Sequence, residues 1–563
     1  KSPMSEQKST ELTIAVMQAN SHLGNVKANF ESLCQKRKRA AEMGADCLLT
    51  PEMYLAGYPA DDLVLRQDFM SRIEKALQDI AELSADGGPA VIVGAPYRNA
   101  GRLFNSVFLI AEGVIQARRD KVNLPNYGVF DDKRNFTAGA LHGPVNLKGW
   151  RLGLAVCEDI WFEDVCETLA ESGADVILSV NASPFDVEKA EQRLVQVVSR
   201  ITETDLPLIY ANMVGGQDEL VFDGGSFALN RAGKLACQFP YFSEHLSCLT
   251  LRRVADDVHL TGPIVQPDGA NEALWRALML GLRDYCDKNG FPSVIFGLSG
   301  GIDSAIVAAL AVDALGSDRV HAVMMPSDYT AEISVTDADK LAKALGIKLD
   351  TLAIRQAMTA FDNMLAPSFE GQNPGLAEEN IQSRLRGMLL MALSNKFGHL
   401  VLATGNKSEY AAGYSTLYGD MCGGFAPIKD VWKTRIFELA RWRNSAVPKG
   451  ALGPTGEVIP DRIITRPPSA ELRPDQQDTD SLPPYEILDE ILIALTEEMA
   501  DIETITARGF DADTVAQASQ LLFRAEYKRF QAAPGPKVTA RAFGRDRRLP
   551  LTSGFRPQIM EKL

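Results

Sequence analysis

Residues 293–309 read SVIFGLSGGIDSAIVAA. The apolar run 294–296 predicts a strand, the glycine-rich segment after it predicts a turn, and a helical pattern begins at Asp303. Backbone N–H groups and the helix dipole both point at such a turn, so the segment predicts an anion-binding site. A Walker loop, G-x-x-x-x-G-K-[ST], would carry a lysine here, whereas this loop contains an aspartate.

The elements around this loop predict a doubly wound α/β domain. Its expected elements are, in order, helix 272–288, strand 293–298, helix 303–315, strand 319–325, helix 333–346 and strand 399–404. This alternation is typical of a parallel sheet whose ligands bind beyond the carboxyl ends of the strands. Residues 447–484 are rich in Pro, Asp and Gln, which predicts loops more than packed structure.

A second α/β domain is predicted in the N-terminal part, where short apolar strands alternate with amphipathic helices. Strands are expected at 12–18, 47–52, 90–96, 106–113, 152–159, 175–183 and 206–213, and helices at 26–43, 68–84 and 188–203. Periodicity is lost over 252–271. The sequence therefore predicts domains at 10–255 and 272–563, joined by a linker at 256–271.

Length and composition limit the possible functions. A chain of 563 residues is too long for one core, and 46% hydrophobic with 23% charged residues is typical of a soluble globular protein. A net charge of −15 disfavours nucleic acid and anionic membranes, which both require clustered Lys and Arg. The glycine-rich loop is therefore expected to bind the phosphates of a small molecule.

The cysteine pattern and the absence of long apolar runs predict a cytoplasmic protein. The eight cysteines are scattered without a C-x-x-C pair, which excludes the common zinc spacings and indicates reduced thiols. No apolar run approaches the roughly 20 residues of a membrane span. The start, KSPMSEQKST, lacks the apolar core of a signal peptide.

The loop at 299–304 favours one kind of phosphate chemistry. Its glycines allow a phosphate chain to approach the backbone, and its serines add hydroxyl donors. An aspartate beside a polyphosphate is repelled unless a divalent cation lies between them, so Asp303 implies Mg²⁺. Such a site suits ATP that is cleaved between its α- and β-phosphates. The structural alternative is a plain strand–turn–helix junction with a capping aspartate.

At this point the sequence resembles a known family. The loop is similar to the pyrophosphate-binding loop of N-type ATP pyrophosphatases. The strings GLAEENIQSRLRGMLLMALSN (375–395), ATGNKSEYAAGYSTLYGD (403–420) and APIKDVWKT (426–434) resemble NAD⁺ synthetases, and the tail 526–555 resembles their glutamine-dependent members. The resemblance implies that ATP adenylates the nicotinate carboxylate of deamido-NAD⁺ and that ammonia displaces AMP.

The resemblance also implies roles for individual residues. The implied ATP-binding residues are Gly297, Leu298, Ser299, Gly300, Gly301, Ile302, Asp303, Ser304, Thr404 and Lys433. Asp303 and Glu409 match the positions that hold Mg²⁺. Asn380, Glu409 and Lys528 match contacts to deamido-NAD⁺, whereas Arg384 (dinucleotide) and Ser469 (ATP) match less closely. Leu417 and Gly424 replace a lysine and an aspartate of the short ammonia-using synthetases, so dinucleotide contacts cannot be copied from those enzymes.

A nitrogen source is expected in the N-terminal domain. Cys157 ends the strand GLAV (153–156), Glu52 follows another strand, and Lys121 follows the strand-like VIQAR (114–118). A cysteine, a glutamate and a lysine at one sheet edge would supply a nucleophile, a base and a cation for a tetrahedral oxyanion, and the lysine would lower the pKa of the thiol. Each residue alone is more often a core cysteine or a surface charge.

The strings around these three residues resemble the Glu-Lys-Cys triad of the nitrilase superfamily. The resemblance implies an αββα sandwich, with Glu52, Lys121 and Cys157 catalytic. Tyr127, Ser183 and Lys189 match glutamine-contacting positions, and Tyr58 is a further candidate for the same pocket or a packing residue. The string GGQDELVFDGGSFALN (215–230) is also similar to the family but receives no chemical role, and Cys166 is interpreted as structural.

The expected function is therefore a glutamine-fed, ATP-dependent amidation. Its implied substrates are ATP, deamido-NAD⁺ and L-glutamine, with Mg²⁺ as cofactor and no nucleic acid or membrane partner. A homo-oligomer is expected from the resemblance alone. Two alternatives stay open: amidation of a different acceptor, and a scaffold that binds nucleotide without catalysis. Intact Glu52, Lys121 and Cys157 disfavour the scaffold.

Overall fold

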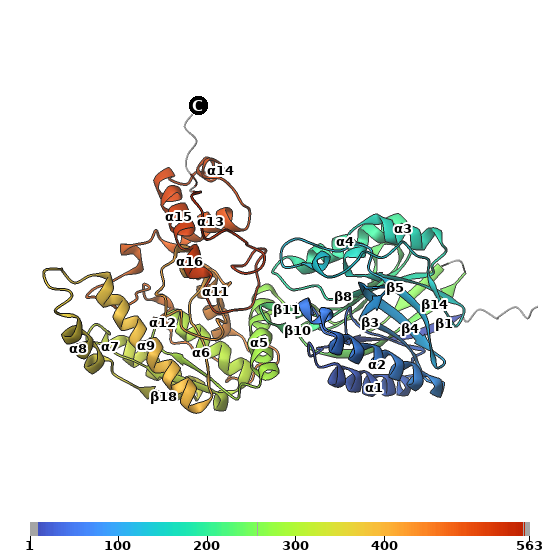
Figure 1. The fold of residues 1–563 in the computed structure, drawn as a ribbon, viewed down its shortest axis with the longest axis horizontal. Helices are drawn as coiled ribbons and strands as arrows, with labels where there is room; N and C mark the ends of the chain where they lie inside the picture. Colours follow the sequence, from blue (N-terminus) through green and yellow to red (C-terminus); the bar gives the residue numbers. More distant parts are fainter. Residues whose placement is uncertain (1–9, 256, 556, 558–563) are drawn as a thin grey trace, which may run out of the picture. The chain divides into compact units, whose positions relative to one another are not determined.

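The computed structural model describes residues 10–255, 257–555 and 557 (Figure 1). The chain divides into two compact units. The first runs to Gly269 except for Asp218–Leu220, and the second contains Asp218–Leu220 and everything from Ala270 onward. None of the helices in the described ranges combines the length and the apolar character required to cross a membrane.

The first unit is built on two sheets. In spatial order, the first sheet contains β15 (Asp257–Thr261), β14 (His245–Val254), β1 (Glu11–Gln18), β2 (Cys47–Leu49), β3 (Ala90–Asn99), β4 (Arg102–Ala111) and β5 (Val114–Asp120). The second contains β13 (Leu235–Gln238), β12 (Phe227–Leu229), β9 (Leu208–Asn212), β8 (Val176–Asn181), β7 (Trp150–Val156) and β6 (Val145–Leu147). β10 (Val214–Gln217) and β11 (Leu220–Asp223) form a separate two-stranded sheet.

Alternation of side chains along the strands decides how these sheets pack. Ile14 of β1 shares one hydrophobic core with Val176 and Leu178 of β8, so this core lies between the sheets. Ile177, which points to the opposite face of β8, packs instead with Val165 against the outer helices.

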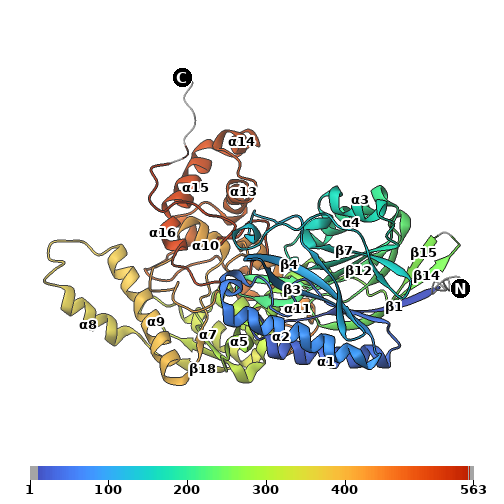
Figure 2. The same ribbon diagram turned by 45° about the vertical axis from the view of Figure 1, so that its right-hand side comes forward.

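Helices cover both outer faces of the first unit. α1 (Val26–Glu42) and α2 (Gln67–Leu83) contact the first sheet, and α3 (Glu163–Glu171) and α4 (Lys189–Thr204) lie on the second (Figures 1 and 2). The resulting order of layers is helix, sheet, sheet, helix.

The second unit contains a four-stranded parallel sheet in the order β18-β17-β16-β19. Its strands are β16 (Val294–Gly297), β17 (Val320–Met324), β18 (Lys348–Thr351) and β19 (Leu400–Val401), and its first helices are α5 (Ala270–Asn289), α6 (Ile302–Leu315), α7 (Glu332–Leu345), α8 (Arg355–Leu365) and α9 (Leu376–Phe397). The chain reverses its direction of travel across the sheet between β16 and β19. In open α/β sheets, ligands bind at such a switch point.

Helices also enclose this second sheet. Every residue of α6 except Asp303 is buried, as expected for a helix that is hydrophobic on all sides. α9 and α8 pack on the other face through Leu390 and neighbouring residues.

Smaller helices complete the unit, and some of them form a second core beside the sheet. They are α10 (Lys407–Ala412), α11 (Lys433–Ser445), α12 (Asp461–Thr465), α13 (Tyr485–Thr496), α14 (Ile502–Ala507), α15 (Ala512–Arg524) and α16 (Glu526–Arg529). Residues of α10 and α13–α15 pack with Trp432 and Phe543 into one hydrophobic cluster. α13–α16 gather at one end of the unit in both Figure 1 and Figure 2.

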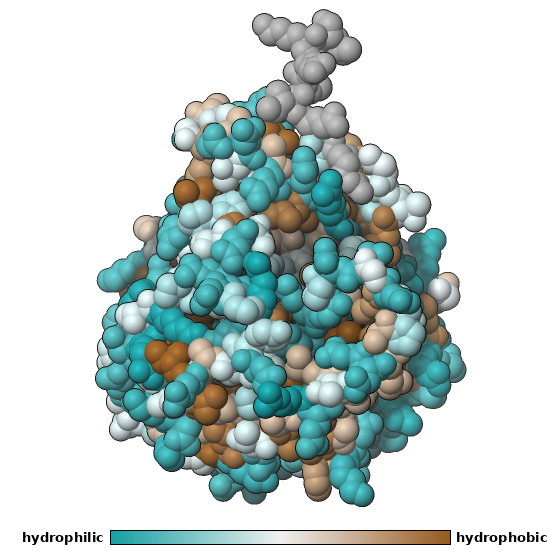
Figure 3. All heavy atoms as spheres, turned by 90° about the vertical axis from the view of Figure 1, so that its left-hand side faces the viewer, coloured by the Kyte–Doolittle hydropathy of each residue, from teal (hydrophilic) through white to brown (hydrophobic). Residues whose placement is uncertain are grey.

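Hydrophobic and hydrophilic side chains are mixed on the surface of the second unit. Met364 on α8 and Met388, Met391 and Phe397 on α9 are exposed. On the face that Figure 3 shows, brown hydrophobic areas are separated by teal hydrophilic ones. The homo-oligomer expected from the resemblance stays a prediction.

Two segments expected to be irregular contain some regular structure. The stretch 447–484 is mostly irregular, as predicted, but it also contains α12 with the buried Ile463 and Ile464. Its backbone at Val458 also donates to the Asn444 side chain over 3.0 Å. Within the predicted linker 256–271, β15 pairs with β14, so this segment is not wholly irregular. The domain boundaries given above stay predictions.

One buried ion pair in the second unit tests this description of its packing. Asp313 of α6 and Arg443 of α11 are both 0% exposed. The Arg443 guanidinium donates to both carboxylate oxygens of Asp313, over 2.6 and 2.9 Å, and the indole N–H of Trp275 donates to the same carboxylate over 2.9 Å. Removal of the carboxylate would leave a buried guanidinium without its counter-charge.

We therefore expect Asp313→Ala to lower the free energy of unfolding of the second unit by about 3–5 kcal/mol. Asp339→Ala is the matched control, because Asp339 pairs with Lys343 on the exposed surface of α7, and such pairs contribute little. Chemical denaturation of the two variants measures the difference. Equal losses in both variants would contradict the packing described here.

Candidate active sites

Cys157 lies at the point where the second sheet of the first unit ends in a tight turn. It follows β7 and begins a short 3₁₀ turn, Cys157–Ile160, with a backbone φ of 47°. A side chain at positive φ is unusual, and such strained positions cluster at functional sites. The carboxylate of Asp159 holds the turn, because it accepts N–H bonds from Val156 over 3.0 Å and from Asn123 over 2.8 Å.

Lys121 places a buried positive charge in the same region. Its ammonium group donates to Glu52 over 2.9 Å and to Asp132 over 2.8 Å, and its side chain has no exposed surface. Glu52 also accepts from the Asn105 amide over 2.7 Å and from the backbone N–H of Ala182 over 2.9 Å. The structure thus brings together the predicted catalytic Glu52 and Lys121.

Two further acidic residues of this site were not identified from the sequence. Asp132 is the second carboxylate on Lys121, and it accepts the hydroxyl of Tyr58 over 3.0 Å. Glu158, directly after Cys157, is the other. Only the adjacency of Glu158 to the thiol could have indicated it, and Asp132 carries no comparable signal in the sequence.

The charges of the site act on the thiol in opposite directions. Burial raises the pKa of Cys157 well above its usual value, the negative charge of Glu52 adds to this, and the ammonium of Lys121 lowers it. Burial would lower the pKa of Lys121, but Asp132 and Glu52 raise it well above its usual value. The expectation that Lys121 lowers the thiol pKa is correct for this pair, but burial outweighs it. The net effect of these surroundings favours the neutral thiol.

The residues expected to contact glutamine lie around this thiol. The hydroxyl of Tyr127 donates to both carboxylate oxygens of Glu158, over 2.9 and 3.0 Å. The ammonium of Lys189 lies 4.4 Å from the ring centre of Trp161, and burial lowers its pKa, whereas the charges of Cys157 and Glu158 raise it. Ser183 is buried in the turn after β8.

The glycine-rich loop of the second unit connects β16 to the N-terminus of α6, at the predicted place. Gly300 has φ +81°, and a Cβ there would lie 2.3 Å from the carbonyl oxygen of Ser334, so only glycine fits. The hydroxyl of Ser304 accepts the N–H of Ser299 and donates to the carbonyl of Gly301, both over 3.2 Å. These bonds fold the loop around the end of α6.

A cavity of about 270 Å³ opens at this loop. All ten residues predicted to bind ATP line it, together with Glu409 and Ser469. The N-terminus of α6 therefore faces a space that is lined by backbone N–H groups and hydroxyls, which favours phosphate groups.

A lysine faces the aspartate of the loop, although it comes from elsewhere in the chain. Lys433, the first residue of α11, forms an ion pair with Asp303, and its ammonium lies 3.8 Å from Glu409. Burial would lower the pKa of Lys433, but the two carboxylates raise it to about 12. Asn406 links the two acids, because its side chain donates to Asp303 over 2.9 Å and its N–H donates to Glu409 over 3.2 Å.

Besides Asp420 and Glu471, Asp478 is a further acidic residue that lines this cavity and that the sequence did not indicate. It lies in the stretch read as loops, and it accepts the hydroxyl of Tyr485 over 2.9 Å. Its other oxygen, Oδ1, is buried without a hydrogen-bond partner, and burial raises the pKa of the group.

The acidic residues fit a cation that arrives with phosphates. Within residues 10–255, 257–555 and 557, no three His, Cys, Asp or Glu side chains form a ready metal site. Mg²⁺ is commonly held by one or two carboxylates together with phosphate oxygens and water. Asp303 and Glu409 match that pattern, and the unpartnered oxygen of Asp478 leaves acceptor capacity beside them.

The residues expected to contact deamido-NAD⁺ do not all lie in this cavity. Glu409 lines it, whereas Asn380 accepts the hydroxyl of Thr416 over 2.9 Å. Lys528 donates to the carbonyls of Gly413 and Ser415 over 2.7 and 2.6 Å. Asn380 and Lys528 thus hold the loop between 413 and 416.

A second cavity adjoins the first. The two share Gly387 and Cys422, and the second is lined by Arg384 and by Leu417 and Gly424. The two positions at which this chain departs from the short synthetases therefore face one cavity.

Comparisons with known proteins find relatives that match both units of the chain. Residues 13–255 match the carbon-nitrogen hydrolase family and residues 274–532 match the NAD synthase family. The glutamine-dependent NAD(+) synthetase of Rhodobacter capsulatus is 47% identical over 97% of this chain and 99% of its own length. That of Thermotoga maritima is 40% identical over 97% of this chain and 100% of its own length.

Solved structures show the same likeness. A glutamine-dependent NAD⁺ synthetase from Acinetobacter baumannii, in complex with ADP, has a TM-score of 0.77 and 40% identity over 98% of this chain and 100% of its own. One from Cytophaga hutchinsonii, at 22% identity, has a TM-score of 0.80 over 97% of this chain and 98% of its own, which supports the fold. The predicted fold class, a nitrilase-like αββα sandwich followed by a doubly wound parallel-sheet unit, is confirmed. The chain belongs to the family of glutamine-dependent NAD(+) synthetases.

Proposed function

We propose that the two units carry the two halves of one amidation. Glutamine is hydrolysed at Cys157 in the first unit, and the ammonia is consumed in the second, where ATP activates the nicotinate carboxylate of deamido-NAD⁺. The products are NAD⁺, AMP, diphosphate and L-glutamate. The observation that supports this most directly is the buried ammonium of Lys121, held against Glu52 beside a thiol at the end of β7.

In the first half-reaction, Glu52 takes the thiol proton as Cys157 attacks the amide carbonyl of glutamine. Lys121 and a backbone N–H stabilise the negative charge that develops on the carbonyl oxygen. The tetrahedral adduct collapses, the proton passes to the amide nitrogen, and ammonia leaves. Water then hydrolyses the thioester, which releases L-glutamate and restores the thiol.

The surroundings of Cys157 favour an amino-acid amide over a simple amide. Glu158 offers a carboxylate to the α-ammonium group of glutamine, with Tyr127 fixing its orientation. Lys189 offers a positive charge to the α-carboxylate, and Ser183 adds a hydroxyl. The opposite charges of Glu158 and Lys189 complement the two charged groups of the substrate.

In the second half-reaction, the nicotinate carboxylate attacks the α-phosphorus of ATP and diphosphate departs. Ammonia attacks the resulting acyl adenylate and AMP leaves. The loop from Gly297 to Ser304 binds the phosphates through backbone N–H groups and hydroxyls, and Lys433 stabilises the charge on departing diphosphate. Thr404 contributes to the ATP site, and Asn380, Glu409 and Lys528 to the site of deamido-NAD⁺.

Mg²⁺ would be held by Asp303 and Glu409, and when bound it neutralises phosphate charge. Before that, the ammonium of Lys433 pairs with Asp303 and lies 3.8 Å from Glu409, so it offsets part of their negative charge. A cytoplasmic location and a homo-oligomeric state stay predictions.

Replacement of the nucleophile tests the division of labour. In Cys157→Ala, we expect NAD⁺ formation from glutamine to fall by at least about 1,000-fold, because no thioester can form. Formation from high concentrations of ammonium should remain. Cys166→Ala is the matched control, since Cys166 is also a buried cysteine of the first unit. NAD⁺ is measured with each nitrogen source, and equal loss from both, or loss from neither, would overturn the scheme.

Replacement of the loop aspartate tests the second site. In Asp303→Ala, we expect NAD⁺ formation from both glutamine and ammonium to fall by about 100-fold or more. The reason is that Mg²⁺, which would compensate the phosphate charge, loses one of its two proposed carboxylate ligands. Asp328→Ala serves as control, since Asp328 is an exposed aspartate of the same unit. Synthesis rates equal to those of the wild type would contradict the proposal that Asp303 holds Mg²⁺.

A further inference from the structure

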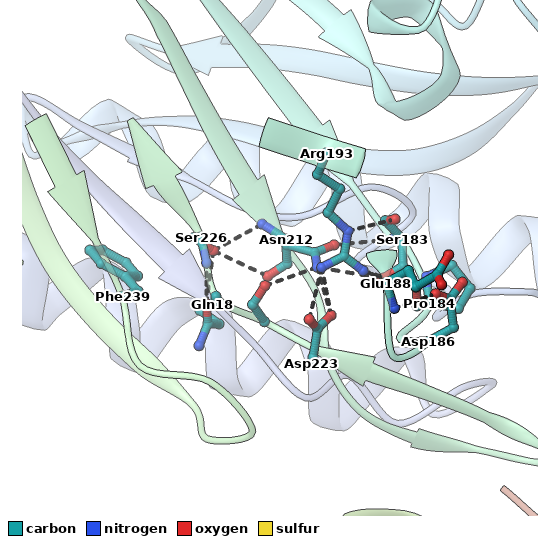
Figure 4. Close-up of polar contacts among 12 residues, drawn as sticks. Gln18, Ser183, Pro184, Asp186, Glu188, Arg193, Asn212, Asp223, Ser226 and Phe239 are labelled. Carbon is teal, nitrogen blue, oxygen red and sulfur yellow. Dashed lines mark hydrogen bonds and ion pairs between the residues drawn. The ribbon is translucent and has the colours of Figure 1, made fainter. Parts of the chain in front are cut away.

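A network of buried polar side chains lies behind the turn that carries Ser183, and no step above uses it. Arg193 of α4 is 2% exposed, Asp223 is 1% exposed and Asn212 is 0% exposed. Figure 4 shows the guanidinium of Arg193 between the carboxylate of Asp223 and the turn at Ser183, with Asn212 and Ser226 on the far side. A buried ion pair is weak evidence for stability, so stability alone does not explain why this network is present.

The guanidinium of Arg193 is fully engaged. Its Nε donates to the hydroxyl of Ser183 over 3.0 Å, and its Nη1 reaches both carboxylate oxygens of Asp223 over 2.8 Å. Its Nη2 donates to the carbonyls of Ser183 over 2.8 Å and Pro184 over 2.9 Å. These five contacts match the five N–H bonds of a guanidinium. Arg193 therefore holds the turn and has no donor left for a substrate.

The same turn faces the reacting groups on its other side. The N–H of Ala182 donates to Glu52 over 2.9 Å, and it lies close enough to Cys157 to lower the pKa of the thiol. The N–H of Ser183 donates to Asn212 over 3.0 Å. Residues 182–184 are thus fixed between the network and the reacting groups. A displacement of about 1 Å at such a position costs orders of magnitude in rate.

Arg193 also orients the hydroxyl of Ser183. This oxygen accepts the N–H of Arg193, and the hydroxyl of Tyr210 also lies within hydrogen-bonding reach of it. In the proposed glutamine site, the hydroxyl that these contacts hold in place would contact the substrate.

The string 215–230, which received no role from the sequence, forms the far side of the network. It contributes Asp223, and its Gly224 carbonyl accepts from the Asn212 amide over 3.0 Å. Gly224 has φ +66°, and a Cβ there would lie 2.4 Å from the side chain of Gln18. The hydroxyl of Ser226 in turn donates to Gln18 over 2.9 Å. Gly224 thus allows the chain to turn, and it also allows the side chain of Gln18 to approach the backbone closely.

We propose that Arg193, anchored by Asp223, is a positioning residue for glutamine hydrolysis: it sets the 182–184 turn so that the Ala182 N–H meets Glu52 and Cys157 and the Ser183 hydroxyl faces the substrate. This inference rests on the proposed glutaminase role of Cys157. Arg193 acts through the turn and does not touch the reacting atoms.

Arg193→Lys is the direct test. It keeps the positive charge and a partner for Asp223, but an ammonium has three N–H donors in place of five and lacks the planar fork. Arg200→Lys is the matched control, because Arg200 lies on the same helix, is also buried, and pairs with Glu203 over 2.7 Å. Asp223→Asn is the second variant, and it decides by the same criteria if Arg193→Lys does not fold.

Two quantities are measured on the full chain: glutamine hydrolysis, and the pH profile of iodoacetamide alkylation at Cys157. We expect Arg193→Lys to lower kcat for glutamine hydrolysis at least about tenfold. Its alkylation profile should move to higher pH, because the Ala182 N–H no longer supports the thiolate. Arg200→Lys should stay within about twofold of the wild type in both measurements, as expected for changes away from the reacting groups.

Three outcomes would overturn the proposal. They are hydrolysis by Arg193→Lys within twofold of the wild type, an equal loss in Arg200→Lys, and a loss of kcat with an unchanged alkylation profile, which would indicate general destabilisation. Cys157→Ala is assayed in parallel. If that variant still hydrolyses glutamine, the proposed active site itself is wrong, and this failure is distinct from a failure of the Arg193 proposal.

Discussion

The ammonium group of Lys121 is enclosed by protein between the carboxylates of Glu52 and Asp132. Transfer of an unpaired charge from water into a protein interior costs several kcal/mol, so this lysine is tolerable only if both carboxylates arrive with it. Glu52 follows β2, Lys121 follows β5, and Asp132 lies in the segment after it. Cys157 and Ala182 come from the second sheet. Packing of the two sheets therefore brings the thiol and the Ala182 N–H to the charge cluster.

In the second unit, a charged residue of the glycine-rich loop likewise depends on a partner from elsewhere in the chain. The loop after β16 lacks a lysine of its own, yet the structure places Lys433 of α11 against Asp303. The structure thus shows how an aspartate is accommodated in a phosphate-binding loop. The acid is paired with a distant lysine, and Glu409 shares that lysine. A nucleotide with its cation would meet a site in which two acids already share one lysine.

Local patterns predicted most of the framework. The strand, glycine turn and helix at 293–309 were predictable because each step has its own signal: an apolar run, glycines that permit close approach, and a helical repeat. The positions of Glu52, Lys121 and Cys157 at strand ends followed from the same alternation, although their roles came from resemblance. The stretch 447–484 is mostly irregular, as its Pro and Asp content predicted, but the burial of its few apolar residues, such as Ile463 and Ile464, could not be predicted from that composition.

Long-range partners could not be predicted in this way. Asp132, Asp478 and Arg193 look like ordinary charged residues in the sequence. Their importance depends on which group each meets across the fold: Lys121 for Asp132, the Lys433 cluster for Asp478, and the 182–184 turn for Arg193. Burial of a charge is a tertiary property, and a single sequence carries little local signal for it.

The central claim is that the thiol of Cys157 forms a covalent bond to the glutamine side chain. Mass spectrometry of the enzyme, quenched with acid during turnover of glutamine and then digested, tests this claim most directly. The account predicts a γ-glutamyl adduct on the peptide that contains Cys157, and its loss as glutamine is consumed. An adduct on another cysteine, or steady release of ammonia without any adduct at Cys157, would contradict it.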